Sequence, residues 1–393
     1  MDFSLYELLL DLPELRIQGV EIEEKSLKIS CELRDKKGQL CPKCKRIVSV
    51  QTPKYVRTIR DLNISGRSVY LLVNVHQYMC ECGRHFMEGL DFVNGSKNHT
   101  KRQAKWIIEM SRKQSHKEVG RLVQMSHKTV ERICYDSVGE RIINWDKIKR
   151  IGIDEFAFKK GHKDFITILV DLDTHEIIDI LEYRDKSSLR TYFQSLGVKI
   201  CKRVEDFCSD MWGPFQDLAA ELFPNALIHI DRFHWTIYLN KIVDNFRKEL
   251  RKSNKEEEAF KRLKWKLIKA KTKLSSTDKK DLKDAFEIST ELEEVYEMKN
   301  MFQAIFDAKF SYPLATQQIS IWKIKAKELK NKHIDEFITF FERHEGNILN
   351  YFKRPITSAV VEGKNNLLRT IKRFTFNMTN FEHFKSRVFA FNP

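Results

Sequence analysis

Between residues 149 and 234, short apolar runs and helical patterns alternate in an order that few folds can accept. Periodicity and composition predict five strands, at 149–155, 165–173, 176–182, 203–210 and 226–230, and two helices, at 187–196 and 214–223. The run at 165–173 (FITILVDLD) is almost continuously apolar, which predicts a strand that is buried on both faces. The order of three strands, helix, strand, helix and strand therefore predicts an α/β domain whose mixed sheet begins with a meander.

Two of these strands are predicted to end in acids. The first (KRIGIDE) carries Asp154 and Glu155, and the fourth (RVEDFCSD) ends at Asp210. The strand order is that of the ribonuclease-H-like nuclease fold, in which the first and fourth strands are neighbours, so we expect these acids side by side. Alternate residues of a strand face opposite sides, so only one of Asp154 and Glu155 enters a common site. Adjacent carboxylates retain protons unless a cation compensates their charge, which predicts a divalent metal site for phosphodiester chemistry.

A third acid is expected from a later helix, and Glu362 in TSAVVEGKNN is the candidate. The same helix carries basic residues that we expect to hold DNA phosphates, namely Lys364, Arg369, Lys372 and Arg373. The long stretch between Asp210 and Glu362 is too long for one helix and a loop, so it predicts an inserted domain.

Helices are expected throughout this insertion, from roughly 233 to 348. Residues 241–290 contain 16 Lys and Arg against 9 Asp and Glu. Such a bundle either clamps DNA through its lysines or presents an ordinary solvated charged face. Trp265 and Trp322 are predicted to be core residues, although stacking on a flipped base is the alternative for each.

Four of the eight cysteines form two close pairs, Cys41-Pro-Lys-Cys44 and Cys80-Glu-Cys82. Four thiolates at close range are a tetrahedral zinc site, and a buried or redox-active cysteine set is the alternative. His85, in CECGRHF, is a possible replacement for one of these ligands. The strand-like run 67–77 (RSVYLLVNVHQ) lies between the pairs, so the sequence predicts a small zinc-stapled β module. The remaining cysteines are scattered among apolar residues, as in a reducing cytosol.

A helical stretch follows the cysteines, from about 97 to 147. Ser115 and Ser126 are placed to cap two short helices, whose inward residues include Val119 and Val130. Two such helices with a tight turn make a helix-turn-helix, although an ordinary helical hairpin fits the pattern equally well. The second helix would present its polar side chains to a DNA groove: His127, Lys128, Glu131 and Arg132.

The charge of the chain points to a polyanionic partner. Lys and Arg number 70 against 55 Asp and Glu, which gives a net charge of +15. No apolar run approaches the ~20 residues of a membrane helix, and the N-terminus (MDFSLYELLLDLPEL) is acidic where a signal peptide is basic. These features favour a cytoplasmic nucleic-acid-binding protein.

The motifs GIDEFAFKKGH, SDMWGPF, IDRFH and VEGKNNLLRTIKR together resemble those of the DDE transposases of bacterial insertion sequences, specifically the ISL3 group. The resemblance covers essentially the whole chain. It implies a catalytic triad of Asp154, Asp210 and Glu362 that holds two Mg²⁺ ions, with Mn²⁺ as a substitute. It also implies that Asp231 and His234 support the site; His234 would contact the scissile phosphate, donate to a carboxylate, or serve only as a structural partner of Asp231.

Together these observations predict a multidomain α/β protein with an RNase H-like core and an all-helical insertion. The expected segments are a zinc-binding module at 1–92, a helix-turn-helix at 93–147, the first part of the core at 148–236, the insertion at 237–348 and the last part of the core at 349–393.

The resemblance implies a DNA transposase that binds terminal inverted repeats, cleaves DNA and transfers strands. Its expected partners are double-stranded DNA and a second copy of the chain, because two ends must be paired, and its expected location is the bacterial nucleoid. Three alternatives stay open: a DNA-binding regulator derived from a transposase, an RNase H-like nuclease without strand transfer, and an RNA-binding protein.

Overall fold

The computed structural model describes residues 3–34, 38–49, 51–139, 142–159, 164–253, 257–376 and 378–391. This part of the chain forms two compact units. The first unit contains the described residues up to 139 together with those from Thr370 on, and the second runs from Ile142 to Arg369. No helix in these ranges is long and apolar enough to cross a membrane.

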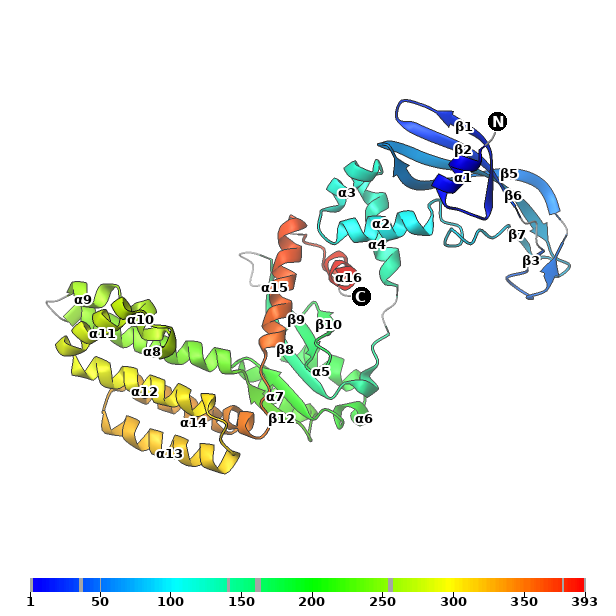
Figure 1. Ribbon diagram of the computed structural model, residues 1–393. Helices are drawn as coiled ribbons and strands as arrows, with labels where there is room; N and C mark the ends of the chain where they lie inside the picture. The colour runs from blue at the N-terminus through cyan, green and yellow to red at the C-terminus, as the bar shows by residue number, and fades with distance from the viewer. Residues whose placement is uncertain are drawn as a thin grey trace. The chain divides into compact units, whose positions relative to one another are not determined.

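The first unit begins with a sheet whose strand order is β1-β2-β6-β5, with β7 added on β6 (Figure 1). Its elements are α1 (Ser4–Leu10), β1 (Leu15–Ile22), β2 (Ser26–Leu33), β5 (Gln51–Ile64), β6 (Arg67–Met79) and β7 (His85–Met87). The predicted strand at 67–77 is β6, whose alternating Val69, Leu71, Val73 and Val75 are buried in the core. A separate two-stranded hairpin pairs β3 (Gln39–Leu40) with β4 (Ile47–Val48).

Helices complete this unit: α2 (Lys101–Ser111), α3 (His116–Val123), α4 (His127–Val138) and α16 (Phe381–Phe391). Ser115 and Ser126 cap α3 and α4 as the sequence predicts, each accepting a backbone hydrogen bond three residues on. Gly120 allows the close approach of the two helices, because a Cβ there would lie 2.7 Å from the carbonyl oxygen of Met125. The C-terminal helix α16 packs on α4 and belongs to the first compact unit, so the predicted segment 349–393 is divided between the two units.

The second unit is built around a five-stranded sheet of order β10-β9-β8-β11-β12. The strands are β8 (Arg150–Lys159), β9 (Asp164–Asp171), β10 (Ile177–Leu181), β11 (Asp206–Ser209) and β12 (Leu227–Ile230). β8, β9 and β10 form the expected antiparallel meander, and β11 is parallel to both β8 and β12. The first strand does not end at its acids as predicted; β8 continues to Lys159 because Phe156 and Phe158 extend the buried face.

Two helices, α5 (Lys186–Ser195) and α7 (Gly213–Leu222), contact each other and share one apolar core with the sheet. Smaller helical turns occur at η1 (Trp145–Lys147) and α6 (Val198–Cys201).

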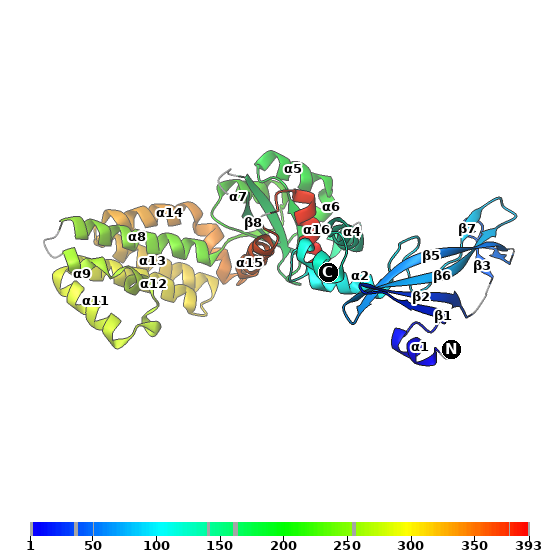
Figure 2. The same cartoon turned by 90° about the horizontal axis from the view of Figure 1, so that it is seen from above.

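Between β12 and the last long helix, α15 (Ala359–Phe374), the chain forms a helical bundle with its own core. Figure 2 shows α8, α12, α13 and α14 side by side in this bundle. Its elements are α8 (Arg232–Ser253), α9 (Glu257–Lys261), α10 (Lys264–Ile268), η2 (Lys271–Lys273), α11 (Ser276–Ile288), α12 (Thr290–Asp307), α13 (Tyr312–Glu328), α14 (Lys332–Leu349) and η3 (Asn350–Phe352).

The two tryptophans of the bundle have different surroundings. Trp322 is 1 % exposed, as predicted for a core residue, and its indole N–H donates to the carbonyl oxygen of Met298. Trp265 is 70 % exposed, so the prediction that it is a core residue is wrong. Its neighbours Leu263 and Leu267 occupy the buried side of this stretch instead, which turns the indole outward.

Candidate active site and metal centre

Asp154 and Asp210 lie next to each other because β8 and β11 are neighbouring parallel strands. The register pairs Cys208 with Gly152, and the same register continued by two residues brings Asp210 beside Asp154. Burial, followed by the negative charges of Asp210 and Glu362, raises the pKa of Asp154 to about 6, although the N–H of Glu155 and the charge of His234 lower it. Burial also raises the pKa of Asp210. Asp210 and Glu362 are therefore close enough to Asp154 to disfavour its ionisation.

Glu362 comes from the first turn of α15, which two contacts hold against the sheet. The Asp231 carboxylate accepts the backbone N–H of Ser358 at 3.0 Å, just before the helix begins. Gly152 lets Val361 approach β8 closely, since a Cβ at that position would lie 2.5 Å from the Val361 side chain. The residue next to Glu362 is thus fixed over the strand that carries Asp154.

Asp231 and His234 both lie near the acids, and a side-chain pair between them was one of the alternatives for His234. The second oxygen of Asp231 accepts the backbone N–H of Phe233, so both oxygens of this buried carboxylate serve the backbone. The positive form of His234 lowers the pKa of both Asp154 and Asp210. His234 is therefore a neighbour of the two strand acids, and no hydrogen bond joins its ring to Asp231 in the described structure.

Asn365 is a site residue that the sequence reasoning missed. Its side chain is 1 % exposed, and its amide N–H donates to Asp154 at 2.7 Å. Its amide oxygen has no hydrogen-bond partner in the part of the chain that the structure describes. A spacing of three residues puts Asn365 and Glu362 on one side of α15, which is the signal that could have identified it.

Glu155 faces away from the acids, as expected for the next residue on a strand. Its carboxylate pairs with the Arg184 guanidinium at 2.6 Å.

On α15, Arg369 donates to Glu362 at 3.0 Å, so this predicted phosphate contact is engaged with an acid. A pocket of about 430 Å³ opens beside Glu362, with walls from Asp231, Arg232, Phe233, Thr236, Thr357 and Ala359.

The four paired cysteines converge as the sequence predicts. Across the described residues, Cys41, Cys44, Cys80 and Cys82 are the one group of three or more His, Cys, Asp or Glu side chains whose ligand atoms all lie within 4.8 Å. His85 is exposed on β7 and is not part of this group. The carboxylate oxygens of Asp154, Asp210 and Glu362 do not all lie within 4.8 Å of one another, so the three acids are more widely spaced than the four thiols.

Backbone N–H groups lower the pKa of both Cys41 and Cys80, whereas the neighbouring thiols lower the pKa of Cys41 and raise that of Cys80. The N–H of Cys44 is the largest influence on Cys41 and lowers its pKa to about 6. The N–H of Cys82 lowers the pKa of Cys80, but burial and the neighbouring thiols outweigh it and raise that pKa to about 12. Four sulfurs this close ionise together only around a cation, which fits zinc.

Comparison with known proteins identifies the family. Residues 151–388 match the model of the ISL3 transposases, and residues 37–83 match the zinc finger of the transposases of IS204, IS1001, IS1096 and IS1165. The chain belongs to the ISL3 transposase family. Over 368 residues it is 24 % identical to the transposase for insertion sequence element IS1001 of Bordetella parapertussis, covering 91 % of this chain and 89 % of that one. Over 126 residues it is 26 % identical to the transposase for IS1557 of Mycobacterium tuberculosis, covering 31 % and 28 %. The protein is therefore a DNA transposase, a DNA-transposing enzyme with a zinc-finger module.

On α4 of the transposase, His127, Lys128 and Arg132 are exposed as predicted. Glu131 is half-buried and pairs with His383 of α16 at 3.1 Å, so it is not available to a groove as expected. The other predicted basic residues lie along α15, where Arg369 and Arg373 are exposed and Lys364 and Lys372 are half-buried.

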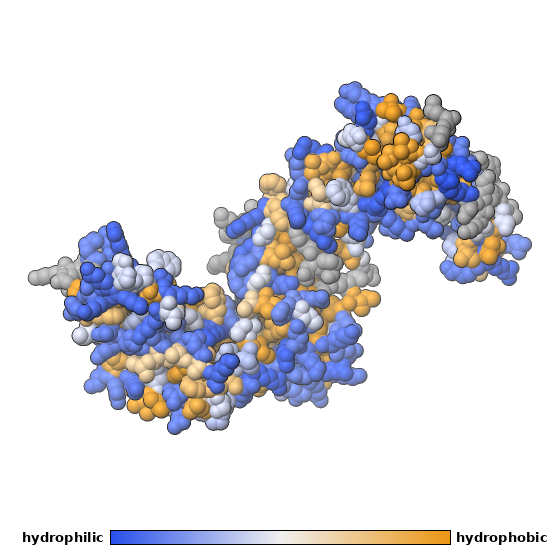
Figure 3. All heavy atoms as spheres, viewed as in Figure 1, coloured by the Kyte–Doolittle hydropathy of each residue, from blue (hydrophilic) through white to orange (hydrophobic). Residues whose placement is uncertain are grey.

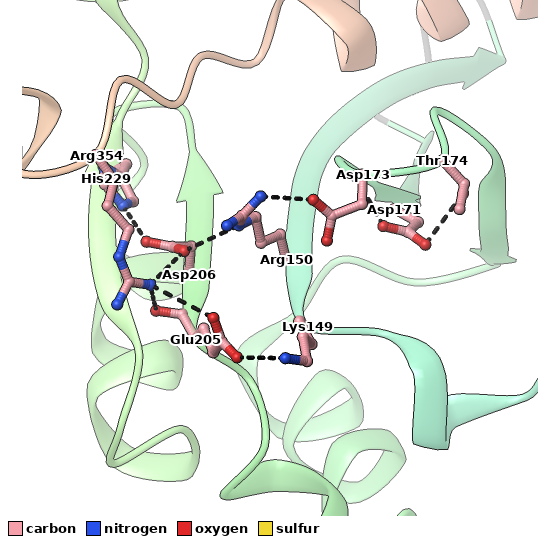
Figure 4. Close-up of polar contacts among 9 residues, drawn as sticks. All are labelled: Lys149, Arg150, Asp171, Asp173, Thr174, Glu205, Asp206, His229 and Arg354. Carbon is pink, nitrogen blue, oxygen red and sulfur yellow. Dashed lines mark hydrogen bonds and ion pairs between the residues drawn. The ribbon is translucent and has the colours of Figure 1, made fainter.

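A second polar cluster lies at the opposite end of the strands from Asp210 (Figure 4). Asp206, the first residue of β11, is fully buried and accepts hydrogen bonds from His229 and Arg354, each at 2.7 Å. Burial raises the pKa of Asp206, but these two partners outweigh it and hold the pKa below its ordinary value. Arg354 lies between the helical bundle and α15, so this cluster ties the start of the segment that carries Glu362 to the sheet. Ion pairs of Lys149 with Glu205 and of Arg150 with Asp173 extend it.

Proposed function

We propose that Asp154, Asp210 and Glu362 form the centre at which this transposase cleaves DNA and joins strands at the ends of an insertion sequence. The observation that supports the proposal is the burial of Asp154 with the negative charges of Asp210 and Glu362 near it, which together raise its pKa to about 6. Such a cluster of acids, held together against their own repulsion, is typical of a site that works with cations.

The donor set fits Mg²⁺, because all three side chains offer carboxylate oxygens and, among the described residues, only Glu362 has an ion-pair partner, Arg369. Asp154, Asp210 and Glu362 would hold two such ions, with Mn²⁺ as a substitute. When bound, these ions supply activation of the attacking oxygen and stabilisation of the leaving oxygen.

The residues around the acids have positioning roles in this proposal. Asn365 keeps the Asp154 carboxylate in one orientation, and Asp231 fixes the start of α15 through Ser358. His234 supplies a polar group beside the two strand acids. In the first reaction, water attacks a phosphodiester phosphorus and the 3′-oxygen leaves as a hydroxyl. In the second, that hydroxyl attacks a target phosphorus and displaces the target's 3′-oxygen.

We further propose that the second unit is an RNase H-like core and that α3 and α4 form a helix-turn-helix. The zinc-stapled module would then position the exposed His127, Lys128 and Arg132 on double-stranded DNA of the terminal inverted repeats. Because two ends must be joined, a homodimer or larger assembly is expected on DNA.

The test is a strand-transfer assay with pre-cut end DNA, plasmid target and Mg²⁺. Asp154→Asn, Asp210→Asn and Glu362→Gln should each abolish joining and retain binding of the end DNA. Glu155→Gln is the matched control, because it removes a neighbouring carboxylate that faces away from the site, and it should remain active.

The alternatives give different results in this assay. Cleavage without joining would support a nuclease, and binding without either reaction would support a regulator. A Glu362→Gln protein that still joins ends would remove Glu362 from the proposed centre.

A further inference from the structure

The helical bundle contains an unusually basic segment. Residues 261–273 (KRLKWKLIKAKTK) contain seven Lys or Arg and no acid. We call this stretch the cationic segment; it includes the end of α9, the short helix α10 and η2. In Figure 3 the surface over α9–α11 is mostly hydrophilic. A run of cations alone is usually a solvated face, so it needs a second observation to indicate a partner.

That observation is Trp265, in the middle of the segment. Its side chain is 70 % exposed, and the Lys264 ammonium lies 4.8 Å from the ring centroid. Leu263 and Leu267 are buried on the other side, so the packing of α10 fixes the indole outward. An exposed, held indole between cations offers a stacking platform beside phosphate-binding groups.

The charges of the segment fall into two groups. Four lysines pair with acids. Lys261 pairs with Glu258 of its own helix, and the other three pair with acids of α11 and α12: Lys266 with Asp281, Lys269 with Asp278 and Lys271 with Glu297. Arg262, Lys264 and Lys273 have no ion pair to any residue that the structure describes. Three cations without an ion pair to a described residue therefore remain in the segment that carries the exposed indole.

We propose that the cationic segment binds DNA that has an unpaired base, with Trp265 stacking on the base and Arg262, Lys264 and Lys273 contacting phosphates. The indole and the cations match the two parts of a nucleotide, its base and its phosphate, whereas an acidic protein would use the cations alone. The proposal rests on the proposed function, since cleavage and joining expose unpaired bases near the ends.

The test measures binding by the full-length zinc-loaded protein that carries Asp210→Asn, so no cleavage interferes. The probes are a blunt duplex and the same duplex with a single-stranded extension containing 2-aminopurine. Trp265→Ala should weaken binding of the extended probe about 5- to 150-fold, in line with the ~1–3 kcal/mol of a stacked base, and leave the blunt probe unchanged. Trp265→Phe should retain most of the affinity, and wild-type binding should change 2-aminopurine fluorescence.

Ile324→Ala is the control, because Ile324 is a 62 % exposed apolar residue of α13 in the same bundle. It should leave both affinities unchanged. Replacing Arg262, Lys264 and Lys273 by Gln should reduce the salt dependence of binding by a slope of about 2.

Equal binding of the extended probe by Trp265→Ala and the parent would overturn the inference, as would equal weakening on both probes. Polyglutamate serves as a competitor that mimics an acidic protein. If it displaces the extended probe equally well from the parent and from Trp265→Ala, the inference would be overturned in favour of an acidic protein partner. If strand transfer proceeds normally in Trp265→Ala, only this inference fails. A parent protein that binds neither DNA would overturn the proposed function as well.

Discussion

Replacing Asp154 by Asn should abolish strand transfer and, at the same time, stabilise the magnesium-free protein. The reason is that the folded state holds Asp154 partly buried near Asp210 and Glu362, where its charge is unfavourable. Asparagine has nearly the same shape and no charge, so it removes both the cost of burying the charge and the repulsion from the other acids.

The size of the effect follows from the pKa. A shift from 3.8 to about 6 costs about 3 kcal/mol of folding free energy once Asp154 is ionised in both states. Because the folded-state pKa is the higher one, the folded state binds more protons between these two values, and stability falls as the pH rises through this window. The two carboxylate oxygens of Asp154 accept hydrogen bonds from the backbone N–H of Glu155 and from the amide of Asn365. Asparagine has only one acceptor oxygen, so one of these hydrogen bonds is lost, which costs about 1 kcal/mol of stability. The net gain at pH 8 is about 2 kcal/mol.

Thermal unfolding in magnesium-free buffer measures this gain. For a domain of this size, Asp154→Asn should raise the Tm by about 4–8 °C at pH 8. The difference in Tm from wild type should be clearly smaller at pH 5. Glu155→Gln breaks an ion pair with Arg184 and should give no such pH-dependent gain. If Asp154→Asn is less stable than wild type at pH 8, or gains equally at both pH values, the acids do not repel each other as argued.

Three further results are expected. Cys44→Ser should lower the bound zinc, about one ion per wild-type chain, and destabilise the first unit; metal analysis and proteolysis test this. Burial, followed by the charge of Arg387, lowers the pKa of His116 to about 3, so the folded state keeps this histidine neutral. Stability should therefore fall by about 2 kcal/mol between pH 7 and pH 5, and His116→Gln should remove that fall in urea unfolding. Changing Lys128 and Arg132 together to Ala should weaken binding to end DNA and reduce the salt slope by about 2, as titrations at several salt concentrations would show.

The order of elements in the second unit could be predicted from the sequence because strands and helices there have clear patterns. The near-continuous apolar run at 165–173 is β9, and both acid-bearing strands are neighbours in the sheet. The end of the first strand could not be predicted, since the charged residues Asp154 and Glu155 resemble a strand terminus. Only the antiparallel pairing of β8 with β9 shows that Phe156 and Phe158 continue it.

Packing partners distant in sequence explain the other errors. Nothing in the local sequence of α16 shows that it packs on α4. The buried Arg387 of α16 also donates to the carbonyl oxygens of Ser111 and Gln114, which lie at the end of α2 and just before α3. The exposure of Trp265 depends on which side of a short helix faces the core, and the side of α10 that is buried is that of Leu267. The pairing of Asp206 with Arg354 joins positions far apart, which no sequence spacing reveals.

The arrangement of these contacts explains how the chain holds three acids together although, among the described residues, only Glu362 has an ion-pair partner, Arg369. Their repulsion favours separation of α15 from the sheet, so attractive contacts elsewhere must offset it. The Asp206–Arg354 pair holds the segment before α15 at one end of the strands, and the Asp231–Ser358 hydrogen bond holds the helix start at the other. The absence of a side chain at Gly152 then lets Val361 reach the strand. Glu362 is therefore positioned by a frame that does not depend on the charge state of the acids, and the site can be preformed before any cation binds.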